Sequence, residues 1–196
     1  SEKSLIDEFI SNFKKDYFKN KEQNKRFSFV LTGGESPRKL YRKLAKINID
    51  WNYVDLFWGD ERYVPSSSKN SNFYLASNEL IKNIKINKKN IFPIKTKKII
   101  LKCSIDYSKL IKKYFKNKKI KFDYCLLGMG EDGHIASLFP NSENLYKKFI
   151  TKPVIRKDFK RITIGLNIIN NSKKILLWLN NKSISKVYLK IKKKGR

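Results

Sequence analysis

The chemistry that the sequence can support centres on the run Gly128–Pro140, GMGEDGHIASLFP, which contains the only histidine of the chain, His134. This histidine follows a glycine-rich stretch at the end of a β-prone segment, where side chains commonly face a cleft. An imidazole exchanges protons near neutral pH and so suits general-base activation of water. We therefore interpret His134 as a catalytic base; the alternative is a histidine of the core. Asp132 is expected either to set the tautomer of its ring or to hold the loop through backbone hydrogen bonds.

A second run, Thr32–Arg38 (TGGESPR), places two glycines between a β-prone segment and a helix start. Glycines let the backbone approach a ligand, and the free N–H groups of a helix start attract anions. Ser36 suits the N-cap and Pro37 the first helical position. We predict that Gly33, Gly34 and Ser36 bind a phosphate; the alternative is an ordinary strand-to-helix turn. The spacings of nucleotide P-loops and dinucleotide-binding motifs are absent.

A third run, Gly59–Arg62 (GDER), carries more charge than a turn requires. Arg62 suits a clamp on phosphate or carboxylate, and Asp60 suits a group that orients a base or moves a proton. The alternative is a solvated ionic turn.

Each of these runs follows a short apolar segment that is typical of a buried strand: Phe27–Leu31, Val54–Trp58 and Phe122–Leu127. Two further strands are predicted over residues 162–166 and 175–179. A first helix is predicted with Ser4 as its N-cap and with Ile6, Phe9, Ile10 and Phe13 on one face. A second helix is predicted to follow an N-cap at Ser104. A final helix is predicted from the apolar stripe Ile184, Val187, Tyr188 and Ile191.

Strands that alternate with helices predict an α/β fold, a three-layer Rossmann-like domain with a mainly parallel sheet flanked by helices. Its ligand site should lie at the carboxyl ends of the strands. The 196 residues are expected to form one domain.

The net charge of +28, from 45 Lys and Arg against 17 Asp and Glu, raises the alternative of a basic nucleic-acid-binding domain. The lysines are scattered through every element in company with Asn and Ile, which indicates a compositional bias, so no nucleic-acid partner is expected. A positive field would still help to collect an anionic substrate.

The two cysteines are too few for a disulfide framework. No metal or organic cofactor is implied, because one histidine without neighbouring ligand-type residues does not make a metal site. The first residues hold no signal-type hydrophobic stretch, and no apolar run approaches membrane-spanning length, so we expect a soluble cytoplasmic protein without a membrane partner.

The motifs TGGESP, WGDERYVP and GMGEDGHIASLFP, in this order and spacing, resemble those of 6-phosphogluconolactonases, which form one superfamily with glucosamine-6-phosphate isomerases. Similarity continues through Ser71–Phe73 and Arg161–Asn167. The lactonases continue the histidine motif with Ala-Ser-Leu-Phe-Pro, as here, whereas the isomerases carry Ala-Phe-Asn-Glu-Pro. The resemblance therefore implies hydrolysis of 6-phospho-D-glucono-1,5-lactone in the oxidative pentose phosphate pathway, with a sugar-phosphate isomerase or deaminase as the alternative.

The resemblance also implies a phosphate-binding lysine near the C-terminus, although the glycine of the family's Gly-x-x-Lys pattern is absent. We favour Lys186, because Val187–Leu189 continues like the family's helix, and Lys182 stays open. In some protozoan parasites such lactonases are fused to a glucose-6-phosphate dehydrogenase. The short ends of this chain would suit a domain excised from a longer or bifunctional chain, or one associated with that dehydrogenase.

Overall fold

A five-stranded parallel sheet with the strand order β4-β2-β1-β5-β8 forms the centre of the computed structural model. The structure describes residues 2–179 and 182–194, except for the side chains of residues 182–184, 191, 193 and 194. Its strands are β1 (Phe27–Leu31), β2 (Val54–Trp58), β4 (Ile91–Phe92), β5 (Tyr124–Leu127) and β8 (Lys174–Leu177). A smaller antiparallel sheet has the order β3-β7-β6, with β3 (Asp60–Arg62), β6 (Thr151–Ile155) and β7 (Lys160–Ile164).

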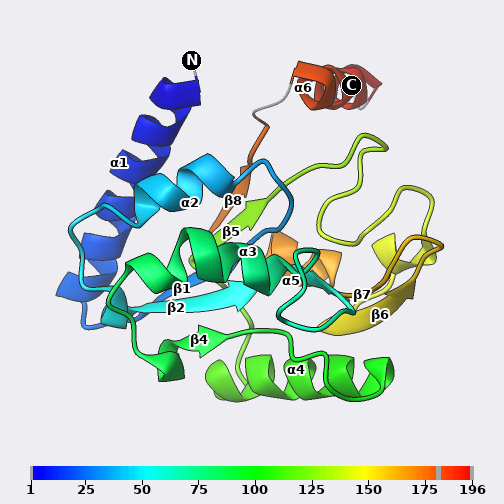
Figure 1. Cartoon of the computed structure of the whole chain (residues 1–196), viewed down its shortest axis with the longest axis horizontal. Helices are drawn as coiled ribbons and strands as arrows, with labels where there is room; N and C mark the ends of the chain where they lie inside the picture. The colour runs from blue at the N-terminus through cyan, green and yellow to red at the C-terminus, as the bar shows by residue number, and fades with distance from the viewer. Residues whose placement is uncertain (1, 180–181, 195–196) are drawn as a thin grey trace.

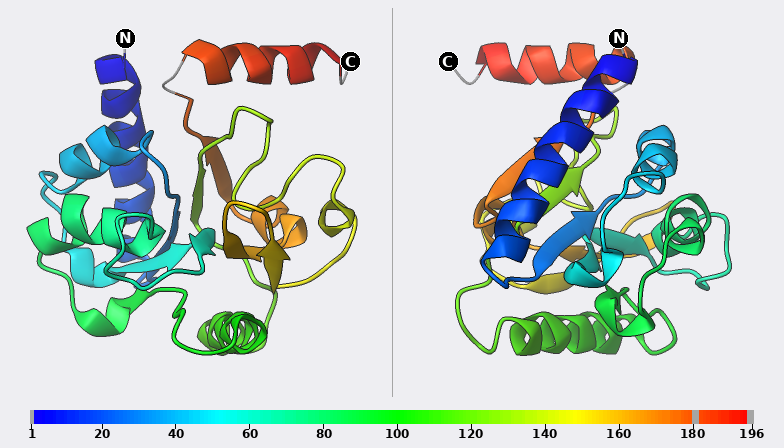
Figure 2. Two further views of the ribbon diagram at one scale, coloured as in Figure 1. Left: turned by 45° about the vertical axis from the view of Figure 1, so that its right-hand side comes forward. Right: turned by 90° about the vertical axis from the view of Figure 1, so that its left-hand side faces the viewer.

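Helices cover both faces of the parallel sheet (Figures 1 and 2). The helices of the structure are α1 (Glu2–Glu22), α2 (Arg38–Leu44), α3 (Asn72–Glu79), α4 (Ile100–Tyr114), α5 (Leu166–Asn170) and α6 (Lys182–Lys194), the last of which lies apart from the sheet (Figure 2). Short 3-10 turns lie at Trp51–Tyr53, Ile81–Asn83, Lys88–Asn90 and Glu143–Leu145. The predicted α/β architecture is therefore confirmed.

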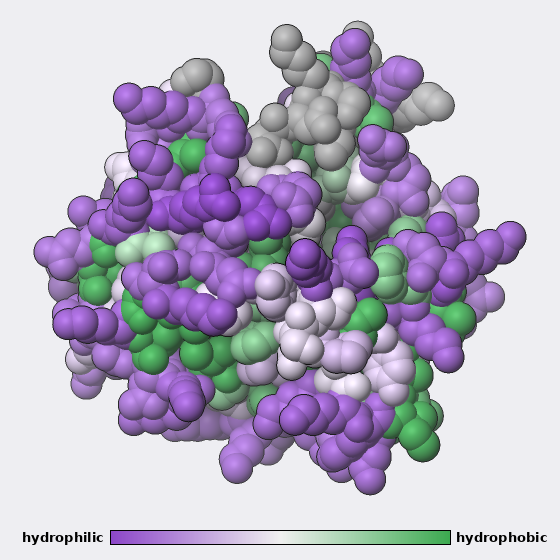
Figure 3. Space-filling model, in the orientation of Figure 1, coloured by the Kyte–Doolittle hydropathy of each residue, from purple (hydrophilic) through white to green (hydrophobic). Residues whose placement is uncertain are grey.

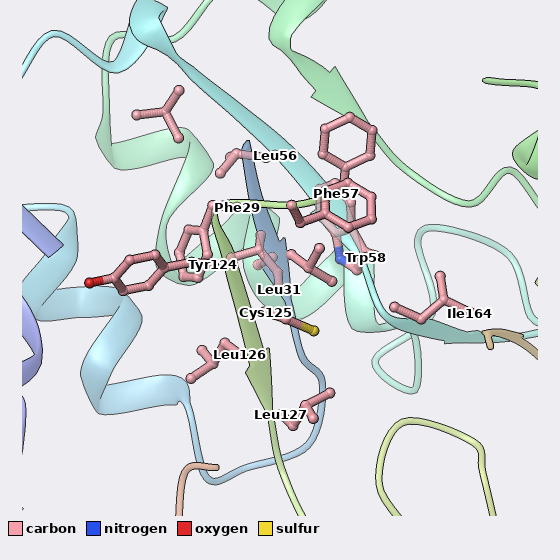
Figure 4. Close-up of a cluster of buried hydrophobic side chains, with 14 of the residues drawn as sticks. Phe29, Leu31, Leu56, Phe57, Trp58, Tyr124, Cys125, Leu126, Leu127 and Ile164 are labelled. Carbon is pink, nitrogen blue, oxygen red and sulfur yellow. The ribbon is translucent and has the colours of Figure 1, made fainter. Parts of the chain in front are cut away.

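Aromatic packing holds α1 and α4 on opposite faces. The ring centroids of Phe13 in α1 and Phe29 in β1 lie 5.2 Å apart. Since β1 and β2 pair Phe29 with Leu56, the next residue, Phe57, points to the other face. There its centroid lies 4.9 Å from that of Tyr114 in α4. Figure 4 shows how the strands fill the space between these layers with large apolar side chains.

The strand predictions succeed where apolar runs are short and bounded by glycine. β1 and β2 have the predicted bounds, and β5 and β8 differ by one or two residues. The strand predicted over residues 162–166 exists as β7, but it belongs to the antiparallel sheet, and Leu166 already begins α5. The final helix is confirmed as α6, which lies at the same end of the molecule as the N-terminus (Figures 1 and 2).

Two predicted helix caps are wrong. Ser4 lies inside α1, which already includes Glu2, an acidic residue that favours a helix N-terminus. Ser104 lies inside α4, where its hydroxyl is 3.1 Å from Oγ1 of Thr151 in β6. Both serines therefore sit in helix interiors, and Ser104 bonds across to a neighbouring strand.

Hydrophilic residues cover most of the face shown in Figure 3. Across the part of the chain that the structure describes, no helix is long and apolar enough to cross a membrane.

Candidate active site

The loops that follow β1, β2 and β5 meet at a cleft of about 410 Å³. They converge because parallel pairing aligns the strand ends, with Leu31 beside Trp58 and Val30 beside Cys125. Six residues singled out from the sequence line this cleft: Gly33, Gly34, Ser36, Asp60, Arg62 and His134. The run Asp60–Arg62 is strand β3 with Asp60 and Glu61 buried, so the alternative of a solvated turn is wrong. The glycine-rich turn, β3 and the histidine thus form one site at the carboxyl ends of the parallel strands.

His134 is oriented by Asp132, which stands outside the cleft lining. The Nδ1 atom of His134 lies 2.5 Å from Oδ1 of Asp132, and the backbone N–H of His134 donates to the same oxygen at 3.1 Å. Burial tends to raise the pKa of Asp132, but these hydrogen bonds outweigh it and bring the pKa below its usual value. An ionised Asp132 accepts the Nδ1 hydrogen, which leaves Nε2 of the ring as the basic nitrogen.

Two further neighbours fix the ring of His134. The ring of Phe139, itself buried, has its centroid 4.5 Å from that of His134. Gly130 lies so close on another side that an added Cβ would stand 2.2 Å from both Cε1 and Nδ1 of the ring. The backbone N–H of Gly130 also donates to the carbonyl of His134 at 2.9 Å, which closes the loop. The position of the imidazole therefore depends on a glycine at 130.

Gly130→Ala should lower kcat about 10²-fold, the usual size of general-base catalysis, because the methyl group displaces the imidazole. Steady-state hydrolysis of the substrate proposed below measures this. Gly59→Ala is the matched control, since its added Cβ would meet the nearest atom at an ordinary 3.6 Å. Equal activity of the two variants would show that ring placement does not depend on Gly130.

Asp60 joins two parts of the site. Its Oδ2 accepts from the hydroxyl of Ser137 at 2.6 Å, and its Oδ1 accepts from Nδ2 of Asn72 at 3.0 Å. Burial raises the pKa of Asp60, and the bond from Ser137 offsets this only in part. Asp60 thus connects the loop that follows His134 to the start of α3.

Tyr41 in α2 holds the glycine turn after β1 through two hydrogen bonds to Thr32. The Tyr41 hydroxyl donates to the carbonyl of Thr32 at 2.7 Å and accepts from its N–H at 3.0 Å. Gly34 has a φ of +79°, which favours glycine. Asn72 packs so tightly on Gly33 that an added Cβ there would overlap its amide. Any side chain at position 33 would therefore displace Asn72.

One prediction for this turn is wrong in detail. α2 begins at Arg38 with Pro37 at the cap position, so Ser36 is neither its N-cap nor its first residue. The chain stays in a turn through residues 34–37, with the Arg38 N–H donating to the carbonyl of Glu35 at 3.2 Å. Ser36 still lines the cleft, and its carbonyl accepts from the indole N–H of Trp178 at 3.0 Å.

The two predicted phosphate-binding cations lie in different places. Arg62 lines the cleft, donates to the carbonyl of Asn70 at 3.3 Å and stacks on Phe159, 5.1 Å from its ring centre. Lys186 is exposed on α6 and is not among the residues that line the cleft. The side chain of the alternative, Lys182, lies outside the described part of the chain.

Sequence reasoning assigned no role to three other residues of the cleft: Asn72, Asp158 and Arg161. Asn72 and Arg161 belong to segments that carried the family resemblance. The signal available for Arg161 was a charged residue directly before the strand predicted over residues 162–166. Asp158 comes from the turn between β6 and β7, whose approach to the cleft depends on the antiparallel sheet. Among the described residues, no group of three or more His, Cys, Asp or Glu could hold a metal ion.

A family model and several known proteins match this chain over most of its length. A family model described as glucosamine-6-phosphate isomerases/6-phosphogluconolactonase matches residues 1–195. A 6-phosphogluconolactonase of Thermotoga maritima is 31% identical over 185 residues, which cover 92% of this chain and 81% of that protein. A probable 6-phosphogluconolactonase of Dictyostelium discoideum is 35% identical over 168 residues, which cover 81% and 70%. The crystal structure of a Thermotoga maritima 6-phosphogluconolactonase matches with a TM-score of 0.88 at 30% identity, covering 96% of this chain and 86% of that one. This chain therefore belongs to the glucosamine-6-phosphate isomerase/6-phosphogluconolactonase family.

Proposed function

We propose that the chain hydrolyses 6-phospho-D-glucono-1,5-lactone to 6-phosphogluconate, as a carboxylic ester hydrolase with His134 as general base. The observation that carries the proposal is that His134, paired with Asp132, lines the same cleft as the glycine turn and Arg62. A relative named 6-phosphogluconolactonase, at 31% identity, and one named probable 6-phosphogluconolactonase, at 35%, support the choice of substrate.

In the proposed reaction, Nε2 of His134 takes a proton from a water molecule as the water oxygen attacks C1 of the lactone. As the water oxygen bonds to C1, the π electrons of the C1 carbonyl move onto the exocyclic oxygen, and they then return to re-form the carbonyl. The bond between C1 and the ring oxygen breaks, and the imidazolium gives the proton to that oxygen. Asp132 keeps the ring in the required tautomer and stabilises its charged form. No other reactant is needed.

The phosphate is proposed to lie against the backbone of Gly33 and Gly34 and near Ser36, with Arg62 supplying charge. This fixes the end of the substrate that does not react. A contact from Lys186 stays a prediction. Asp60, which holds both Asn72 and Ser137, is proposed to position the two halves of the site.

The test is to supply the purified chain with the 6-phospholactone and, separately, with glucosamine 6-phosphate. Formation of 6-phosphogluconate above the spontaneous rate, without ammonia release from the amino sugar, is expected. Ammonia release without lactone hydrolysis would instead identify the isomerase branch of the family. The run Ala136–Pro140 has no glutamate, which favours the lactonase.

The predicted cytoplasmic location and the fusion to, or association with, a glucose-6-phosphate dehydrogenase belong to this proposal. Joint purification of the dehydrogenase activity with the natural protein from a cytosolic fraction would support both. Recovery of the lactonase activity in another cell fraction would contradict the cytoplasmic location. Its recovery without the dehydrogenase activity would contradict the fusion or association.

A further inference from the structure

Arg161 is a buried cation in the wall of the cleft. It lies on β7 with 7% of its surface exposed and lines the same cleft as His134. Its Nη1 donates to Oδ1 of Asp158 at 2.8 Å and to the carbonyl of Phe159 at 3.0 Å, and its Nη2 donates to Oδ2 of Asp158 at 2.6 Å. A guanidinium has five N–H hydrogens, so within residues 2–179 and 182–194 the Nε hydrogen and one Nη2 hydrogen remain for a ligand.

Arg161 and His134 contact the same aromatic ring, that of Phe139. The guanidinium carbon of Arg161 lies 5.6 Å from the centre of the Phe139 ring, the ring on which His134 packs with a 4.5 Å centroid separation. Arg161 also interacts electrostatically with Asp132, the partner of His134. Its charge therefore acts close to the catalytic base.

Arg62 shares one ring with Arg161 but has different neighbours. The centre of the Phe159 ring lies 5.1 Å from the guanidinium carbon of Arg62 and 5.7 Å from that of Arg161. Arg62 also lines a neighbouring cavity of about 540 Å³ together with Gly34, and Arg161 does not. The two arginines thus share the Phe159 ring, and of the two only Arg62 lines the neighbouring cavity with Gly34.

We infer that Arg161 is a catalytic residue that donates hydrogen bonds to the carbonyl oxygen of the lactone as this oxygen becomes an oxyanion. The inference rests on the proposed function. The oxyanion exists only between attack of water on C1 and loss of the ring oxygen, so a cation held in place beforehand stabilises the transition state more than the ground state. The ion pair with Asp158 supplies this fixed orientation.

If Arg161 instead contacted the phosphate of the substrate, its loss would have a different kinetic effect. A phosphate contact acts on ground state and transition state alike, so its loss raises KM and the Kd of any sugar phosphate. Loss of an oxyanion donor lowers kcat and leaves the affinity for glucose 6-phosphate unchanged, because that sugar has no carbonyl at C1 in its ring form.

The experiment compares Arg161→Met with Arg156→Met, after the wild-type chain has been shown to hydrolyse the 6-phospholactone. Arg156 is the matched control, since it is exposed, stacks on the same Phe139 ring at 4.2 Å and does not line the cleft. For Arg161→Met we expect kcat to fall about 10²-fold, with KM and the Kd of glucose 6-phosphate within about twofold of wild type. Arg156→Met should retain the wild-type kcat.

Arg161→Lys serves if the methionine variant fails to fold; it keeps the charge without the forked donors and should show a smaller fall in kcat at unchanged KM. An unchanged kcat in the variant that folds, or a change confined to KM and the Kd of glucose 6-phosphate, would overturn the inference and leave the proposed function standing. Absence of hydrolysis by the wild-type chain would overturn both the inference about Arg161 and the proposed function. Because the wild-type chain is assayed first, failure of the proposed function is distinguished from failure of the inference alone.

Discussion

His134→Asn should lower kcat for 6-phosphogluconolactone about 10²-fold or more, the usual contribution of a positioned general base. Asparagine is close in size to histidine and can still bond to Asp132, but it cannot take a proton from water. Because the imidazole is held by Asp132 and Phe139 and not by the glycine turn, KM and the Kd of glucose 6-phosphate should stay near their wild-type values. Steady-state kinetics and calorimetry measure the two effects separately.

Glu131→Gln is the control for this substitution. Glu131 lies on the same loop, is exposed and is not among the residues that line the cleft, so its loss of charge should leave kcat unchanged. Wild-type turnover by His134→Asn would remove His134 from the reaction, and an equal fall in both variants would indicate general damage to the loop.

Arg62→Ala should raise the Kd of glucose 6-phosphate about 10- to 100-fold, the range expected for loss of a hydrogen bond to a charged group. The effect should fall on KM for the lactone, since the phosphate is bound equally in the ground state and the transition state. Arg62 and Gly34 both line the cleft and the neighbouring cavity, so the change removes a cation that shares both spaces with the glycine turn.

Lys69→Ala provides the comparison for Arg62. Lys69 is an exposed cation that lines only the neighbouring cavity, so its removal lowers the net charge equally without touching the cleft. Similar losses of affinity in the two variants would mean that Arg62 acts only through the overall field. An equal loss by Arg62→Ala toward an unphosphorylated lactone would contradict its phosphate role.

The fold and the gathering of the three motifs could be predicted because both depend on local patterns. β1 and β2 are apolar runs closed by glycine, and strands that alternate with helices place their carboxyl ends along one edge. Gly33, Asp60 and His134 therefore line one cleft although the chain separates them widely.

What the sequence could not predict depends on contacts between distant segments. β3 pairs with β7 through partners such as Asp60 and Thr163, and no local pattern in either segment specifies that pairing. The same sheet brings Arg161 into the cleft, so the position of Arg161 could not be predicted from local sequence patterns either. Ser104 looked like a helix cap because serine favours that position, yet in the fold it bonds to Thr151 instead.

The central claim, phosphate-anchored lactone hydrolysis with His134 as base, is tested most directly by proton release on adding freshly made 6-phosphogluconolactone. Hydrolysis by this site predicts a rate above the spontaneous one, proportional to the concentration of the chain and reduced about 10²-fold in His134→Asn. A rate equal to the spontaneous one with the wild-type chain, or an excess rate that the substitution leaves unchanged, would contradict it.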